Sequence, residues 1–206
     1  FFLSIACGEK MKHIISIIIL SLVLFSCAKE ESDDSATTEL EGTWVTSCNV
    51  YSDSLYRKLT TVVSGTNFTV NYEYFSDSSC TTAASKWVDT QTSLSIGDAM
   101  VFSTYGASGG SGHQFTVYHN STTAEWQNAS DVSWANTNSY CGETDWELNV
   151  AQDVSGKTCG SSTEWSSGIT IYGLYILDGN KFMPSYDEDS YPSSVSSADS
   201  NTFIKQ

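Results

Sequence analysis

The chain has 206 residues, nine of them Lys or Arg and 24 Asp or Glu, so its formal net charge at pH 7 is −15. Nucleic-acid binding draws most of its affinity from basic side chains, so this charge balance argues against a nucleic-acid partner. Ser, Thr, Gly, Asn and aromatic residues dominate, and the common helix formers are scarce. Such a composition favours a secreted β-protein.

Residues 11–26, MKHIISIIIL SLVLFS, predict a secretion signal. Lys12 supplies the positive start, and residues 14–25 form an apolar stretch interrupted only by serines. Twelve helical residues rise about 18 Å, which is too short to cross a hydrocarbon core of about 30 Å. The stretch therefore fits a signal peptide rather than a transmembrane helix. We expect residues 1–10, including Cys7, to be an upstream extension outside the fold.

The signal ends in Leu24-Phe25-Ser26-Cys27, with an aliphatic residue three positions before the cysteine and a small residue directly before it. This segment resembles the lipobox of bacterial lipoproteins. The resemblance implies that Cys27 is diacylated and becomes the first residue of the mature chain. It also implies the bacterial cell envelope, in particular the outer membrane, with the domain facing the periplasm or the surface. An ordinary signal peptide and a short buried helix are the alternatives.

Residues 27–40 follow as the lipidated cysteine and a polar, acidic tether without periodicity, which we expect to be disordered. A single β-domain is predicted for residues 41–206. From Cys27 onward the chain keeps seven basic and 23 acidic residues, which gives a net charge of −16. Anionic headgroups would be repelled by this charge, so the membrane is a partner only through the N-terminal lipid.

Four further cysteines lie in the predicted domain: Cys48, Cys80, Cys141 and Cys159. Four cysteines permit three pairings. We expect Cys48–Cys80 and Cys141–Cys159, because each pair closes a local loop and an exported chain can oxidise them. A zinc site is the alternative, but there is no CxxC pair and no histidine close in sequence.

The domain shows short strand patterns separated by turns, which favours an antiparallel up-and-down barrel or a β-sandwich. Within residues 67–75, Phe68, Val70, Tyr72 and Tyr74 share one face, as expected for a sheet with one buried side. No helical period of useful length is found, and residues 105–112 predict a glycine-serine loop. Strands are expected at 43–51, 55–64, 67–75, 84–88, 93–96, 99–103, 114–119, 169–177, 181–183 and 202–205, with a turn at Gly97-Asp98.

Gly42-Thr43-Trp44 opens the first expected strand, directly after the tether. It resembles the glycine-x-tryptophan signature on the first strand of lipocalin-like (calycin) barrels. The resemblance implies an eight-stranded barrel in which this tryptophan closes one end, often beneath an arginine from the last strand. Here the last strand offers Lys205.

Three stretches of the chain partly match catalytic or metal-binding patterns. Residues 106–110 match GxSxG, but the nucleophile elbow needs a strand-to-helix turn, and this match lies in a loop between strands. His113 and His119 would share a strand face, yet no third ligand lies nearby. The acidic run 187–189 lacks the EF-hand glycine, so it is interpreted as a solvated loop. We therefore expect no enzyme, no metal and no cofactor.

Residues 121–167 are polar and irregular but contain Trp126, Trp134, Trp146 and Trp165. Exposed tryptophans can stack on sugars or form an interface, while buried ones would be ordinary core. Three functions remain open. The first is a non-enzymatic envelope lipoprotein whose barrel binds a small apolar or amphiphilic ligand. The second is a surface adhesion or carbohydrate-binding module that uses the four tryptophans, and the third is a structural envelope protein without a ligand.

Overall fold

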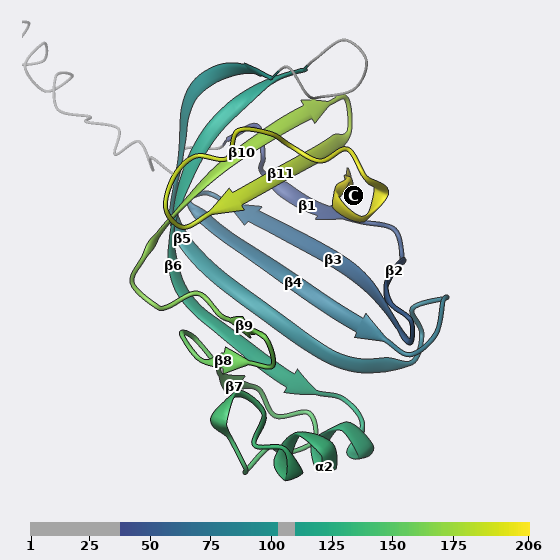
Figure 1. Ribbon diagram of the computed structural model, residues 1–206. Coiled ribbons are helices and arrows are strands. Elements are labelled where there is room, and N and C mark those ends of the chain that lie inside the picture. Colours follow the sequence, from purple (N-terminus) through teal and green to yellow (C-terminus); the bar gives the residue numbers. More distant parts are fainter. Residues whose placement is uncertain (1–37, 103–109) are drawn as a thin grey trace, which may run out of the picture. The chain divides into compact units, whose positions relative to one another are not determined.

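The computed structural model describes residues 38–102 and 110–206, and within them antiparallel strands close into a barrel (Figure 1). The eight barrel strands are β1 (Gly42–Val45), β3 (Leu55–Ser64), β4 (Asn67–Phe75), β5 (Ala83–Phe102), β6 (Gly110–Trp126), β10 (Thr170–Asp178), β11 (Lys181–Asp187) and β12 (Phe203–Lys205). Two short strands extend the same sheet: β2 (Asn49–Ser52) pairs with β3, and β7 (Gln152–Asp153) pairs with β6. The predicted all-β class is confirmed, in its barrel form.

Each barrel strand pairs with the next one along the chain, from β1 with β3 to β11 with β12. The last strand, β12, pairs with β1 and sets Lys205 opposite Trp44, which closes the sheet on itself. Some neighbouring strands are joined by short turns, such as the one after Ser64. Gly65 has a φ of 57° there, a left-handed conformation that costs glycine nothing.

Strand β5 is 20 residues long where the sequence predicted three short strands. Its register against β6 shifts at three places, the last between Ile96 and Ala99. The predicted turn at Gly97-Asp98 is wrong because these residues form that last irregularity, which bends the strand without ending it. Strand β6 is also longer than predicted and takes in residues 110–112 of the expected loop; residues 103–109 lie outside the described residues.

Large aromatic side chains fill the barrel toward the end where β10 turns into β11. Trp44 is 2% exposed, and its ring lies 5.4 Å from that of Phe182. Its indole Nε1 donates a hydrogen bond of 2.7 Å to the Leu40 carbonyl. From the last strand, Lys205 Nζ lies 4.9 Å from the centroid of the Trp44 ring, a cation–π geometry.

The fold begins before the predicted boundary at residue 41. Leu40, assigned to the tether from its acidic surroundings, is fully buried in the core. Glu39 accepts a hydrogen bond from the Tyr175 hydroxyl. The compact unit runs from Ala36 to Gln206. Because every described strand, both disulfides and the core lie within this unit, it can fold without the residues that precede it.

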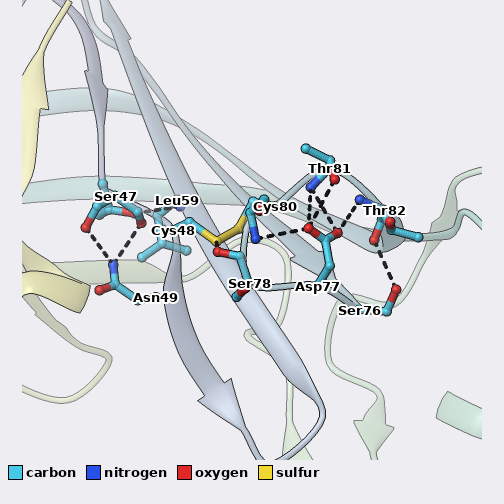
Figure 2. The surroundings of a disulfide bond; sticks show 12 residues. Ser47, Cys48, Asn49, Leu59, Ser76, Asp77, Ser78, Cys80, Thr81 and Thr82 are labelled. Carbon is cyan, nitrogen blue, oxygen red and sulfur yellow. Dashed lines mark hydrogen bonds between the residues drawn. A yellow bond between two sulfur atoms is a disulfide. The ribbon is translucent and has the colours of Figure 1, made fainter.

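Cys48 and Cys80 form a disulfide that joins the β1–β2 connection to the loop between β4 and β5, as predicted (Figure 2). The loop is organised by Asp77, whose carboxylate accepts hydrogen bonds from the backbone N–H groups of Thr81 and Thr82. These bonds, the one from Thr82 first, lower the pKa of Asp77 to about 2. The loop is therefore closed both by the disulfide and by backbone hydrogen bonds to one carboxylate.

Residues 127–169 connect β6 to β10 and, with β7, gather at one end of the barrel (Figure 1). The missed helix α2 (Ala129–Thr137) begins at Asn128, whose side chain accepts a hydrogen bond from the Asp131 N–H. It shows no helical pattern because only Ala135 of its nine residues is buried. The remaining elements are η2 (Tyr140–Gly142), β8 (Thr158–Cys159) and β9 (Ser162–Thr163), and η3 (Asp199–Asn201) precedes β12. The second predicted disulfide, Cys141–Cys159, ties η2 to β8.

Candidate functional site

A cavity of about 360 Å³ opens at the barrel end that is covered by the β6–β10 connection. Seven aromatic side chains line it, and we call them the aromatic wall: Tyr51, Tyr72, Tyr74, Trp87, Trp126, Tyr140 and Trp165. Six of them come from β2, β4, β5, β6 and η2, and Trp165 follows β9. Segments far apart in sequence therefore build one concave site.

Strand alternation explains how β4 contributes to this wall. Phe68 and Val70 are buried in the core, and the next two residues on the same face, Tyr72 and Tyr74, line the cavity. Trp87 of β5 lies opposite Tyr72 in the register. The inward face of the sheet thus changes from aliphatic and phenyl groups in the core to phenol and indole groups at the mouth.

The floor of the cavity is polar and contains one carboxylate. Asp89 of β5 and Thr122 of β6 both line the cavity and are 6% and 2% exposed. The Thr122 hydroxyl donates to Asp89 Oδ1 at 2.7 Å. Next to it, His119 Nε2 lies 3.1 Å from the same hydroxyl oxygen, and His119 is fully buried.

The contacts of His119 favour its protonated form. Its Nδ1 lies 3.0 Å from the Ser166 carbonyl oxygen, which can only accept, so Nδ1 carries a proton. Its Nε2 lies beside the Thr122 hydroxyl, which donates to Asp89. The Asp89 carboxylate lies 3.9 Å from Nε2, where it stabilises a positive charge on the ring.

Burial acts to lower the pKa of His119, but Asp89, the Ser166 carbonyl and Asp153 together outweigh it and raise that pKa above 6.5. The charge of Asp89 also affects the pKa of other groups around the floor. Burial, followed by the Asp89 charge, raises the pKa of Tyr72 and of Tyr186. The same two causes raise the pKa of Glu164 at the cavity rim.

A hairpin formed by β8 and β9 covers the cavity; we call residues 157–165 the covering hairpin. Its residues Ser162, Thr163 and Glu164 line the cavity. Lys157 Nζ at its start lies 2.6 Å from Glu143 Oε1, and the disulfide at Cys159 attaches it to η2. The covering hairpin is thus held by an ion pair and a covalent bond.

The four tryptophans predicted to bind a ligand have three different environments. Trp126 and Trp165 line the cavity. Trp146 is 2% exposed and packs beneath Trp126, with ring planes at 85°. Trp134 is 51% exposed and meets Trp126 edge-on at 68°. The structure therefore brings two of the four to the cavity and does not arrange them as one flat platform.

Sequence reasoning missed most of the site. Tyr72 and Tyr74 were assigned to the buried face of their strand, but not to the mouth of a barrel. Trp87 and Asp89 are two positions apart and so share one face of β5, but nothing in the sequence shows which residues of β4 they lie opposite. Their place follows from the β4–β5 register, which sets Asp89 opposite Val70.

Other predicted features fall outside the cavity or outside the described residues. Residues 1–37, which include Cys27 and the predicted signal peptide, are not among the described residues. His113 Nδ1 donates a hydrogen bond to the Gly97 carbonyl oxygen. The two histidines have different environments, since His119 is fully buried and His113 is not. Across residues 38–102 and 110–206, no group of three or more His, Cys, Asp or Glu side chains is placed to hold a metal ion.

Comparison with known proteins finds no matching protein-family model and no matching curated protein. Among the helices of the described part of the chain, none combines the length and apolar character needed to span a bilayer. Function has therefore to be inferred from the cavity itself.

Proposed function

We propose that the chain is a non-enzymatic cell-envelope lipoprotein, anchored through Cys27, whose barrel binds a small apolar or amphiphilic ligand in the cavity. The observation that carries this proposal is the aromatic wall around a cavity of about 360 Å³. Small-molecule sites typically occupy about 300–1,000 Å³, are lined by hydrophobic and aromatic side chains, and lie in the mouths of β-barrels. The cavity fits a compact ligand at the lower end of that range.

A buried donor at the cavity also supports ligand binding. Trp126 lines the cavity, and its indole Nε1 is buried without a hydrogen-bond partner among the described residues. An unpaired buried N–H costs about 1–3 kcal/mol. A ligand oxygen that accepted this hydrogen would remove the cost and would orient the ligand in the cavity.

Two features support the proposed location. The chain carries the LFSC segment that ends at Cys27. Its described part holds two disulfides, and disulfides persist in oxidising compartments such as the periplasm. We propose attachment to the outer membrane through the lipid on Cys27.

Kinship with lipocalin-like barrels belongs to the same proposal. The chain has a closed barrel in which Trp44 of the first strand packs beneath a basic side chain of the last strand, Lys205. A lysine over the ring provides the same kind of cation–π contact as an arginine, without the planar stacking of a guanidinium.

An adhesion or carbohydrate-binding module is the second candidate, because aromatic rings and carboxylates together also suit a sugar. Sugar-stacking surfaces need exposed, flat aromatic faces. Of the four tryptophans named for that role only Trp134 is exposed, and its contact with Trp126 is edge-on. This arrangement supports a ligand held inside the cavity better than it supports the carbohydrate function.

The test uses the neutral fluorescent probe N-phenyl-1-naphthylamine and the unit Ala36–Gln206. Ser162 and Ser161 are neighbouring exposed residues of the covering hairpin, but only Ser162 lines the cavity. We expect saturable binding to the wild type, at least about tenfold weaker binding to Ser162→Trp, which fills the mouth, and unchanged binding to Ser161→Trp. Equal binding to all three proteins, or no saturable binding to the wild type, would contradict the proposal.

A further inference from the structure

The charges that line the cavity all have one sign. Asp89 at the floor and Glu164 at the rim are the charged side chains of its lining, and within the described residues that lining contains no Lys or Arg. Both carboxylates face the same space as the aromatic wall. An incoming ligand therefore meets negative charge among aromatic ring faces.

The two carboxylates of the lining differ in whether a cationic side chain is paired with them. His119 is committed to Asp89 through Thr122 and is fully buried. Arg57, the chain's one arginine, lies over the Tyr51 ring at 4.9 Å. Glu164 has no ion-pair partner among the described residues. Of the two carboxylates, the less buried Glu164 is therefore the one without an ion-pair partner in the described part of the chain.

Neighbouring groups report the same negative field. Burial, and after it the charge of Asp89, raises the pKa of Glu164, of Tyr72 and of Tyr186, while His119 acts to lower that of Glu164. A ligand with a carboxylate or phosphate would meet the same repulsion. Fatty acids and anionic lipids are accordingly poor ligands for this cavity.

We propose that the ligand is a small organic ammonium cation, held with its charge beside Glu164 and its apolar part against the aromatic wall. This inference rests on the proposed ligand-binding function and names the chemical class of the ligand. Ammonium groups are attracted to the faces of Trp and Tyr rings within about 6 Å of the centroid, most strongly where water is excluded. Trp87, Trp126 and Trp165 offer such rings around the cavity.

The charge of the whole chain acts in the same direction. The sequence from Cys27 onward carries a net charge of −16. A surface of this sign raises the local concentration of cations and accelerates their association, in a manner that salt weakens. Long-range attraction and local recognition thus favour the same class of ligand.

The test compares three probes of matched shape by calorimetry on the unit Ala36–Gln206. Benzyltrimethylammonium carries the charge, neopentylbenzene replaces its nitrogen by carbon, and benzylphosphonate carries the opposite charge. We expect benzyltrimethylammonium to bind at least about tenfold more tightly than neopentylbenzene, and benzylphosphonate not to bind at concentrations up to about 10 mM.

Two charge-neutralising variants locate the effect. Glu164→Gln keeps the shape of the side chain, and we expect it to weaken benzyltrimethylammonium binding about tenfold and to leave neopentylbenzene unchanged. Glu147→Gln is the matched control, because Glu147 is exposed on the same connection and does not line the cavity. An equal loss of benzyltrimethylammonium affinity in both variants would show that only the net charge of the protein matters. It would overturn the proposed position of the ammonium group beside Glu164.

The outcomes separate the two levels of the proposal. Binding of neopentylbenzene at least as tight as that of benzyltrimethylammonium overturns the cation inference and leaves ligand binding standing. No binding of any probe, together with no binding of N-phenyl-1-naphthylamine, overturns both. Phosphatidylcholine vesicles distinguish the source of the cation: cosedimentation of the unit with them indicates a lipid headgroup, and a unit that stays in solution but binds benzyltrimethylammonium indicates a free amine or quaternary ammonium.

Discussion

His119 is fully buried, with Asp89 3.9 Å from its Nε2 and the Ser166 carbonyl oxygen 3.0 Å from its Nδ1. The pKa of His119 is raised above 6.5 in the folded protein. A raised pKa contributes stability that is complete below the unfolded value and is lost as the pH rises through the folded value. We therefore expect the free energy of unfolding to fall as the pH is raised from about 6 to about 9, as measured by urea denaturation.

The variant His119→Gln tests the origin of this slope. Removing one partner of a buried ion pair leaves Asp89 without its counter-charge, so we expect a loss of about 3 kcal/mol at pH 6. The remaining stability should be nearly independent of pH between about 6 and 9. A slope that persists in His119→Gln would assign the pH dependence to another group.

Gly173 of β10 shows how closely the barrel interior is packed. It lies opposite Phe115 in the β6–β10 register, and a Cβ at this position would come within 2.2 Å of the Phe115 ring. Because Phe115 is fully buried, its ring has no room to move aside. We expect Gly173→Ala to lower the free energy of unfolding by about 3 kcal/mol in urea denaturation.

Gly97 provides the matched control for Gly173. A Cβ at Gly97 would meet Gln114 at 3.5 Å, an ordinary contact distance. We expect Gly97→Ala to change stability by less than about 1 kcal/mol, because the smaller entropy of the unfolded chain offsets any local adjustment. Equal losses in Gly97→Ala and Gly173→Ala would contradict the tight packing of Phe115 on Gly173.

The two disulfides stabilise different elements. Cys48–Cys80 spans 32 residues beside the barrel, whereas Cys141–Cys159 spans 18 residues and holds the covering hairpin. Chain-entropy arguments give about 4 and about 3 kcal/mol for loops of these lengths. We expect both double Cys→Ser variants to lower Tm, but only the Cys141/Cys159 variant to weaken N-phenyl-1-naphthylamine binding, because Cys159 lines the cavity. Equal affinity in both variants would show that the covering hairpin has no part in the site.

The elements that the sequence predicted best are those with strong local signals. The limits of β3 and β4 agree with the prediction because residues 55–75 form a single hairpin with a glycine turn. The sequence prediction divides β5 into three strands, and its second break is at Gly97-Asp98, which looks like a turn locally. Only pairing with β6 shows these residues to be an irregularity within a long strand. Helix α2 was missed because its stabilisation comes from the Asn128 cap and from contacts of one buried residue rather than from an apolar face.

The site was less predictable than the fold, for a physical reason. Its aromatic wall is assembled by register and closure, which are long-range properties of the sheet. Alternation assigns Tyr72 to an inward face but does not show that Trp165, 93 positions later, lies over the same cavity. Both disulfide pairings were predictable, since each joins segments that are close in sequence.

For the whole molecule, the proposed anchor predicts the mass of the protein purified from a bacterial membrane fraction. We expect a chain that starts at Cys27, is heavier by its acyl groups, and gains about four mass units on reduction of two disulfides. Cys27→Ser should abolish the acyl mass and release the protein from the membrane fraction. An unmodified chain that retains Met11 would contradict the anchor, while the barrel and its cavity would be unaffected.

The cavity at the barrel mouth is tested most directly by a crystal structure of the unit Ala36–Gln206 grown with benzyltrimethylammonium. We expect density for the cation inside the cavity, with its nitrogen within about 6 Å of the ring centroids of the aromatic wall and on the side of Glu164. A cavity that contains only water at saturating concentration, or a cation bound elsewhere on the barrel, would contradict a ligand-binding role for this site.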